Sequence, residues 1–226
     1  MTDGIKYLEH SAFYIKSGEY GILIDPWFMH NEEVKFDITT EKITHILLTH
    51  GHGDHFGDTV PIAKMTKAKV IAIFETAIYC QKLGLEAIGV GMSAEIKTDF
   101  GSVRFLQATH TNSLPNGEYG GIAASILIDL NGIKIFHAGD TGLIGDFELI
   151  GKLYKPYYAM LPIGGHYTMG VEEAIIAAGM LNAKEYIPMH YNTFDVIKAD
   201  PVAFKTALEE QGKTCHIMAA NDTLTF

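Results

Sequence analysis

The sequence has few cysteines and no segment that resembles an export signal or a membrane anchor. The two cysteines among its 226 residues, Cys80 and Cys215, lie far apart and form no CxxC pair. This usage argues against a disulfide framework and favours a reducing compartment. The N-terminal residues lack the basic segment and apolar run of a signal peptide, and no stretch approaches the ~20 apolar residues of a membrane-spanning helix. We therefore expect a cytoplasmic protein with no membrane partner.

Basic residues are also scarce. The sequence has 17 Lys and Arg residues and 27 Asp and Glu residues, which gives a net charge of −10. Proteins that bind nucleic acid need clustered cations to displace counterions from the phosphates, and the sequence has no such cluster. We therefore expect a small-molecule partner and no nucleic acid, while a homo-oligomer stays open.

Segments that resemble interdomain linkers are missing as well. The sequence contains no Ser/Pro-rich stretch, low-complexity run or block of like charges that would mark a boundary. With 226 residues, of which 47% are hydrophobic, the chain is long enough to bury a full core. These features predict a single domain that spans residues 1–226.

Short apolar or alternating segments predict strands, and several of them are followed by segments with helical spacing. The predicted strands cover residues 5–8, 12–15, 21–24, 46–49, 70–73, 103–109, 123–129, 133–137, 158–162 and 185–189. The predicted helices cover residues 59–67, 75–83, 147–154, 172–181 and 201–211. Asn131-Gly132 indicates a hairpin turn, and Asp200 before Pro201 suits the start of a helix. The order suggests an α/β (α+β) fold with two packed sheets and helices outside, a four-layer αββα sandwich.

The heptapeptide THGHGDH holds three imidazoles and a carboxylate directly after a predicted buried strand. Residues two apart in an extended segment point to the same side, so His50 and His52 can bind one ion. A turn at Gly53 would let Asp54 and His55 face a second ion. Imidazole and carboxylate groups are the ligands that suit zinc and neighbouring transition metals. The alternative is a polar surface loop, which four candidate ligands at this spacing disfavour.

This heptapeptide matches the HxHxDH signature of the metallo-β-lactamase superfamily, which the chain resembles from residue 5 to about residue 195. The other motifs keep the family's order: ILIDP at 22–26, ATHTNS at 108–113, HAGDTG at 137–142 and PMHYNTF at 188–194. Together with LEHSAF and LPIGGHYTMG, they look like an uncharacterised metal-dependent hydrolase branch near the L-ascorbate-6-phosphate lactonases. The resemblance implies a four-layer sandwich of the metallo-β-lactamase type.

The resemblance assigns three histidines to one divalent ion, an aspartate and two histidines to a second ion, and one further aspartate as a bridge between them. The ligands of the first ion are His50, His52 and His110, and those of the second ion are Asp54, His55 and His190. The bridging residue is Asp140. The last three motifs agree with this assignment, because each places its ligand just after a predicted strand. The two ions are expected to be zinc, although the same ligands suit manganese, nickel or iron.

Other polar residues of these motifs are expected to support the site. Asp25 resembles the aspartate that orients the histidine loop in this superfamily, and ligating imidazoles usually donate their second N–H to such a partner. His166, in a glycine-rich loop, is either an acid or oxyanion donor or a surface histidine. His10 fits the family pattern and a buried structural role equally well, and His137 is expected to support Asp140. Three histidines carry no functional signal: His30, His45 and His216.

Two metal ions about 3.5–4 Å apart can share a water and lower its pKa toward neutrality. We therefore expect a binuclear hydrolase whose metal-bridging hydroxide attacks a small-molecule lactone, ester or phosphoester, with Asp54 and His166 as catalytic residues. One alternative is a phosphodiesterase that acts on nucleotides or short RNA, and the other is a metal-containing metabolite sensor without turnover. Antibiotic hydrolysis is not favoured, because the β-lactamases of this fold carry a Cys in place of Asp140.

The purified chain should not bind nucleic acid at physiological salt, because its few cations are not clustered for phosphate contacts. A gel-shift titration with short RNA and duplex DNA at several salt concentrations measures this directly. Submicromolar, salt-sensitive binding would contradict the expectation and would revive the phosphodiesterase alternative.

Overall fold

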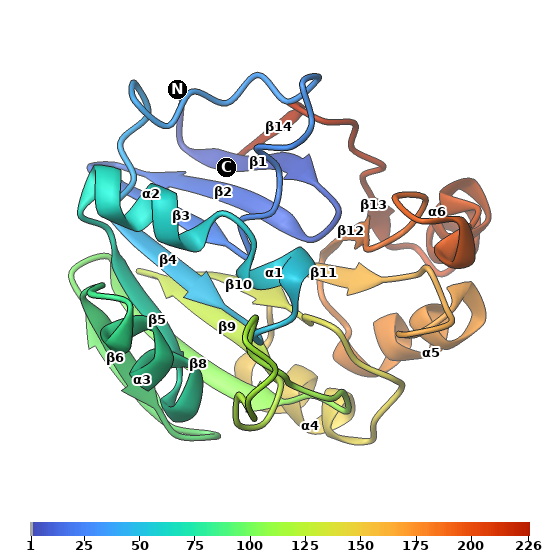
Figure 1. Cartoon of the computed structure of the whole chain (residues 1–226). Helices are drawn as coiled ribbons and strands as arrows, with labels where there is room; N and C mark the ends of the chain where they lie inside the picture. Colours follow the sequence, from blue (N-terminus) through green and yellow to red (C-terminus); the bar gives the residue numbers. More distant parts are fainter. Residues whose placement is uncertain (1) are drawn as a thin grey trace. The chain divides into compact units, whose positions relative to one another are not determined.

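Two seven-stranded β-sheets form the framework of residues 2–226, the part of the chain that the computed structural model describes (Figure 1). One sheet lies in each of two compact units. Unit 1 contains the residues up to Gly91 together with Thr111–Ala123 and Met218–Phe226, and unit 2 contains Met92–His110 and Ala124–Ile217. The predicted mixed α/β fold with two sheets is confirmed. The single domain over residues 1–226 stays a prediction.

The sheet of unit 1 joins an antiparallel meander to a parallel part. In sheet order, its strands are β14 (Thr223–Thr225), β1 (Gly4–Glu9), β2 (Ala12–Ser17), β3 (Tyr20–Ile24), β4 (His45–Leu48), β5 (Lys69–Ile73) and β6 (Ala87–Val90). Strand β2 pairs antiparallel with β1 and β3, as predicted for a meander, whereas β3 to β6 pair in parallel. Therefore β1, β3 and β4 run in one direction and end at one edge, which we call the carboxyl edge of unit 1.

Helices pack on this sheet because each buries a stripe of apolar side chains. The helices of unit 1 are α1 (Gly53–Phe56), α2 (Thr59–Thr66) and α3 (Phe74–Lys82). Ile62 of α2 and Ala77 of α3 are fully buried in the same hydrophobic cluster as Val70 of β5. The predicted helices at 59–67 and 75–83 are therefore confirmed to within one residue at each end.

The loop that was expected to turn at Gly53 forms the short helix α1 instead. The His55 N–H donates to the His52 carbonyl at 3.0 Å. The Gly57 N–H donates to the Gly53 carbonyl, also at 3.0 Å. Asp54 lies in the first turn, where the helix dipole favours a carboxylate. Helical hydrogen bonds therefore turn the chain at this point.

The sheet of unit 2 also combines parallel and antiparallel pairing. In sheet order, its strands are β13 (Thr214–Cys215), β12 (Glu185–Met189), β11 (Tyr158–Pro162), β10 (Ile133–His137), β9 (Ala124–Leu130), β8 (Gly101–Gln107) and β7 (Glu95–Thr98). Strands β10 to β13 are parallel, and β9 is antiparallel to both β8 and β10. Strands β8, β10, β11 and β12 therefore end at one edge, the carboxyl edge of unit 2.

The turn between β9 and β10 is the hairpin that the sequence predicts. Asn131 and Gly132 both have positive φ angles, 54° and 112°, and the Gly132 N–H donates to Asp129 Oδ1 at 2.7 Å. Positive φ at both central residues suits the right-handed twist of the flanking strands. The Asn-Gly pair therefore fixes the register in which Ile133 faces Leu130.

The helices of unit 2 are α4 (Asp146–Tyr154), α5 (Val171–Leu181) and α6 (Pro201–Glu210), with a 3-10 turn, η1 (Asp195–Ile197). Helix α5 packs against β11, α4 and α6. A Cβ on Gly151 of α4 would collide with the Leu181 carbonyl, so this glycine permits the close approach of α4 and α5. The predicted start of α6 is confirmed, because Asp200 Oδ1 accepts the Val202 N–H at 2.9 Å.

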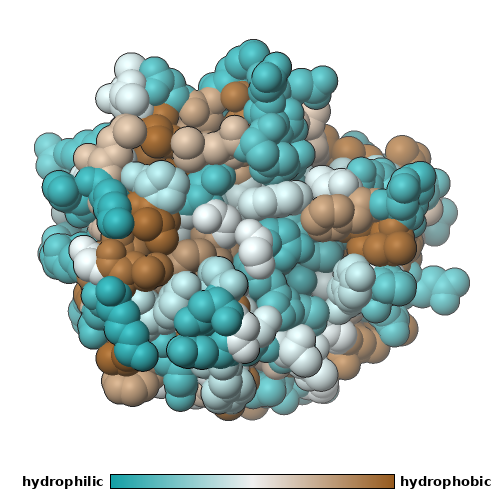
Figure 2. Space-filling model, viewed as in Figure 1, coloured by the Kyte–Doolittle hydropathy of each residue, from teal (hydrophilic) through white to brown (hydrophobic). Residues whose placement is uncertain are grey.

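No helix in the described part of the chain has both the length and the apolar character required to cross a membrane. On the face shown in Figure 2, hydrophilic residues dominate and the hydrophobic residues form separate patches. Large apolar side chains are exposed at several positions, including Leu149 of α4 and Val202 of α6.

The two cysteines, Cys80 and Cys215, are free and buried. Burial raises the pKa of the Cys80 and Cys215 thiols to about 12, so both stay protonated near neutral pH, and the thiolate is the reactive form. We expect the native protein to be inert to the thiol reagent DTNB near neutral pH, whereas the guanidinium-unfolded chain should react at both cysteines. Fast labelling of the folded protein would contradict this expectation.

Candidate metal centre

The segment after β4 brings the rings of His50 and His52 together. His50 Nε2 lies 3.0 Å from His52 Nδ1. Two nitrogens bound to one tetrahedral zinc ion at about 2.0 Å are expected to lie about 3.3 Å apart, so the observed spacing fits a shared ion. The two rings therefore lie together, as the extended geometry of the segment predicts, and their binding of one ion stays a prediction.

Asp25 is a buried carboxylate that holds both ends of this segment. It directly follows β3, and its Oδ1 accepts the Thr49 N–H at 2.8 Å while its Oδ2 accepts the Thr49 hydroxyl at 2.5 Å. The same Oδ2 lies 2.7 Å from His55 Nδ1, and both of these side chains are fully buried. Asp25 thus occupies the orienting position that the family resemblance implies.

These contacts determine which ring nitrogens can bind a metal. An ionised carboxylate only accepts hydrogen bonds, so His55 Nδ1 must donate to Asp25, and His55 Nε2 is left as the ligand atom. The Thr49 hydroxyl has one proton, which it gives to Asp25, and it therefore accepts from His50 Nδ1, 3.0 Å away. His50 Nε2 is then also a ligand atom. One carboxylate thus sets the tautomers of two imidazoles, one directly and one through a threonine.

Asn112 is a site residue that the sequence analysis did not identify. Its Oδ1 accepts the Gly51 N–H at 2.7 Å, between the two histidines, and its Nδ2 donates to the Gly120 carbonyl at 2.8 Å. A Cβ on Gly51 would come within 2.9 Å of the Ser113 carbonyl, so this close approach requires glycine. The only sequence signal was the position of Asn112 two residues after His110.

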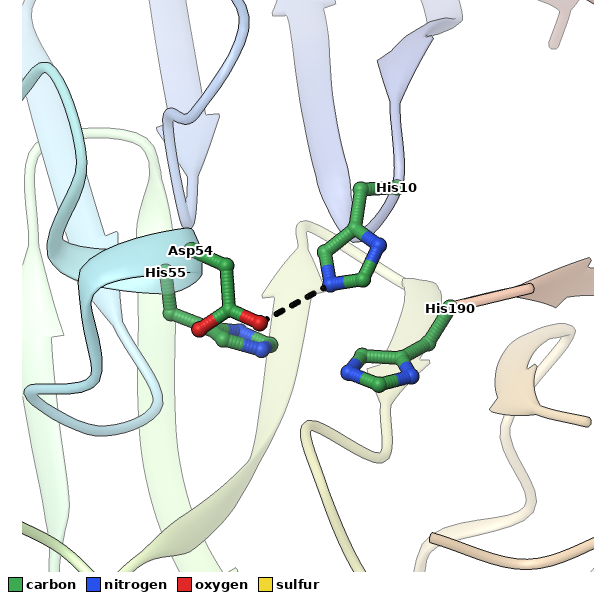
Figure 3. A group of neighbouring side chains, drawn as sticks. All are labelled: His10, Asp54, His55 and His190. Atoms are coloured by element: carbon green, nitrogen blue, oxygen red, sulfur yellow. Dashed lines mark ion pairs between the residues drawn. The ribbon is translucent and has the colours of Figure 1, made fainter. Parts of the chain in front are cut away.

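His10, the residue after β1, lies against two predicted ligands of unit 1 (Figure 3). Its Nε2 is 3.3 Å from Asp54 Oδ2, the pair that the dashed line marks. Its ring packs edge-on against that of His55, with 5.6 Å between the ring centroids, and against that of Trp27 at 5.2 Å. The structure therefore places His10 beside the candidate ligands of unit 1.

The predicted ligands of unit 2 meet around one carboxylate. Asp140 Oδ2 lies 3.5 Å from His110 Nε2 and 3.0 Å from His190 Nε2. The three residues follow β8, β10 and β12, which all end at the carboxyl edge of unit 2. Asp140 and His190 are buried, whereas His110 is slightly exposed. A carboxylate that faces two imidazoles in this way suits a ligand shared between two ions.

Three histidines and one aspartate at the two carboxyl edges have a left-handed backbone. The φ angles of His10, Asp25, His166 and His190 lie between 45° and 56°. This conformation is uncommon for residues other than glycine, although His and Asp adopt it more often than branched residues. Such strain costs on the order of 1–3 kcal/mol per residue and tends to persist at functional sites. The backbone therefore turns sharply where these side chains leave their strands.

His137 and His166 lie on neighbouring segments of unit 2. His137 Nδ1 accepts the Gly139 N–H at 3.1 Å, so this buried ring supports the segment that leads to Asp140, as expected. His166 is exposed, with its ring 4.4 Å from that of Tyr167. The Met169 N–H donates to the carbonyl of Thr141 at 2.9 Å and ties the two segments together. A catalytic role for His166 stays a prediction.

The histidines without a sequence signal make polar contacts outside the ligand set: His30 with Glu9, His45 with Thr44, and His216 with Glu185.

The donor groups of each unit fit a transition metal ion. Neutral imidazoles with fixed tautomers and ionised carboxylates are the ligands of zinc and its neighbours. The donor atoms of Asp25, His50 and His55 lie within 4.8 Å of one another. Both Asp25 oxygens, however, are used by Thr49 and His55, so we assign Asp25 to hydrogen bonding and not to ligation. The chain therefore contains histidine and aspartate clusters that are able to bind metal.

Known proteins share this architecture and these motifs. The model of the Beta-lactamase superfamily domain matches residues 4–190, more than half of the chain. The chain belongs to this superfamily. A UPF0173 metal-dependent hydrolase of Bacillus cereus is 42% identical over 98% of this chain and 99% of its own length, and one of Heliobacterium modesticaldum is 38% identical over 98% and 97%. The solved structure of Igni18, a metallo hydrolase from the archaeon Ignicoccus hospitalis, matches with a TM-score of 0.91 and 36% identity over 100% of this chain and 99% of that one.

Within the β-lactamase superfamily, the chain therefore falls among the UPF0173 metal-dependent hydrolases. The family resemblance predicted from the HxHxDH segment and the later motifs is confirmed. The relatives' names state that they are metal-dependent hydrolases and name no substrate.

Replacing Asp25 with Asn should weaken metal binding by about 10–100-fold, the typical cost of losing a hydrogen-bond partner behind a ligating histidine. The amide would point a donor at Thr49 or His55 and disturb both tautomers. Chelator competition on the metal-free protein measures the affinity, and circular dichroism reports the fold.

Two further variants make this test specific. Thr49→Val removes only the link between Asp25 and His50, and it should cause a smaller loss of metal affinity. Asp200→Asn, at the start of α6 in unit 2, is the matched control and should leave the affinity unchanged. Unaltered metal affinity in folded Asp25→Asn would show that Asp25 does not orient a ligand.

Proposed function

We propose that the chain is a binuclear metal-dependent hydrolase that cleaves a small-molecule lactone, ester or phosphoester. One ion would have three histidine ligands, His50, His52 and His110. A second ion would be bound by Asp54, His55 and His190, and Asp140 would bridge the two ions. We expect zinc, while manganese, nickel and iron accept the same ligands.

The observation that carries this proposal is that each unit presents histidine and aspartate donors at its carboxyl edge. Unit 1 offers the paired His50 and His52 nitrogens. Unit 2 offers Asp140 between two imidazoles. Four of the seven proposed ligands lie in unit 1 and three in unit 2. The full-length match to the metallo hydrolase Igni18 supports the proposal.

When bound, two ions would activate a water as the nucleophile and polarise the substrate oxygen that accepts charge. The chain supplies the remaining functions. Asp54 would direct its carboxylate toward the second ion, with His10 Nε2 at 3.3 Å to hold its orientation. Neither cysteine is suited to act as a nucleophile, because both thiols are buried and protonated. His166 would donate a proton or a hydrogen bond to the substrate from its exposed loop.

Hydrolysis of model substrates tests the activity. The metal-loaded protein should turn over p-nitrophenyl esters with added zinc or manganese, and a chelator should abolish the reaction. Turnover of bis-p-nitrophenyl phosphate alone would favour the phosphodiesterase alternative. An absence of turnover on both, with melting shifts caused by metabolites, would favour the sensor.

Asp140→Asn should lose much of one of the two metal ions and most of the activity, while the fold stays intact. The amide removes the negative charge that offsets two nearby dications, and a neutral amide is a poor bridge. Elemental analysis of protein purified without chelator should give two ions per chain for the parent and fewer for the variant. A variant with two ions and full turnover would refute the bridging assignment.

Two companion variants separate ligands from other histidines. His166→Ala should keep the full metal content, and its activity should fall by about 10²-fold, as is typical for the loss of an acid or an oxyanion donor. His216→Ala, whose ring contacts Glu185, should change neither quantity.

A further inference from the structure

The segments that contain the candidate site residues include no lysine or arginine. In unit 2 they are residues 108–110, 138–145, 163–170 and 190–197, and in unit 1 they are residues 10–11, 25–31, 49–58 and 111–123. The 17 basic residues of the chain all lie elsewhere. The first cation after β12 is Lys198, which is exposed and pairs with Asp195 at 2.8 Å. These segments therefore offer no cation of their own to an anionic group, and the nearest lysines after β3, Lys35 and Lys42, lie further along the connection to β4.

Helix N-termini often replace cations in anion binding, but those of unit 2 already face carboxylates. Helix α4, after the Asp140 segment, has Asp146 and Glu148 in its first turn. Helix α5, after the His166 segment, has Glu172 and Glu173 there, and Glu173 Oε2 accepts the Gly170 N–H at 3.0 Å. A phosphate or carboxylate would meet like charge at both helices, so these helix ends do not form an anion site.

Large apolar side chains are exposed in these same segments. Leu143, Tyr167 and Phe194 follow β10, β11 and β12, and their exposed fractions are 38%, 55% and 38%. Each lies in a segment that also contains Asp140, His166 or His190. Pockets for small molecules typically combine an apolar lining with a few polar groups that fix the orientation of the ligand. This edge of unit 2 has that composition.

We propose that the substrate carries an uncharged, apolar acyl or aryl arm, and that Leu143, Tyr167 and Phe194 bind this arm. The inference rests on the proposed hydrolase function and narrows it. Of the lactones, esters and phosphoesters, it selects carboxylic esters and lactones with neutral hydrophobic substituents. Sugar phosphates and nucleotides are disfavoured, because their non-reacting phosphates require Arg, Lys or a helix N-terminus.

Two esters of equal length test the inference. p-Nitrophenyl hexanoate ends in a methyl group, whereas the mono-p-nitrophenyl ester of adipate ends in a carboxylate, and the reacting bond is the same in both. We expect kcat/KM to be about tenfold or more higher for the hexanoate, the scale of discrimination that an apolar pocket achieves. Equal values, or a preference for adipate, would contradict this inference and leave the proposed hydrolase intact. Turnover of bis-p-nitrophenyl phosphate but of neither ester would contradict this inference alone, whereas turnover of none of the three would refute both.

Variants locate the binding site of the arm. Tyr167→Ala and Phe194→Ala should raise KM for the hexanoate with little change in kcat, the pattern of lost uniform binding. Leu143→Lys should shift the preference about twofold to fivefold toward the adipate ester, the range of an exposed ion pair. Leu149→Lys on α4 and Val202→Ala on α6 alter exposed apolar positions outside these segments, and neither should change the ratio. An unchanged ratio in Leu143→Lys would refute the placement.

Discussion

The buried carboxylate of Asp25 is the interaction on which the candidate metal centre depends. It accepts three hydrogen bonds from residues at the two ends of the ligand segment. In a site without exposure to water, such bonds are strong when satisfied and costly when broken. Asn112 holds the middle of the same segment through the Gly51 N–H. Asp25 and Asn112 thus hold the ligand segment in position, which reduces the reorganisation that metal binding requires.

Most regular elements could be predicted from periodicity alone. The bounds of β10, β11 and β12 agree residue for residue with the sequence-based expectation, because each is a short apolar run between turn-forming residues. The strands that were missed, among them β7 (Glu95–Thr98) and β13 (Thr214–Cys215), are very short or lack a buried face. Helix α1 is not predicted because its four residues, Gly-Asp-His-Phe, look like a loop, and only its hydrogen bonds define it.

Only part of the site could be predicted from the sequence, because some of its contacts are local and others join residues that are far apart in the chain. The convergence of His50 and His52 depends only on local geometry. His110 and His190 come together around the carboxylate of Asp140, although the three residues follow three different strands. This assembly could be expected only from the family resemblance. The hydrogen-bonding role of Asn112 and the tautomers of His50 and His55 arise from long-range contacts. No property of the residue types alone indicates them, so the structure was required.

The sheet of unit 1 is complete only when β14 has paired with β1. Leu224 of β14 faces Ile5 of β1, and the Tyr7 N–H donates to the Asp222 carbonyl at 3.0 Å. During synthesis, β1 emerges early and β14 only after the long continuous segment of unit 2. Until then one side of β1 is an unpaired strand edge, which is prone to pairing with other chains. Strand β1, which leads to His10, therefore gains its second neighbour only after residues 223–225 have been made.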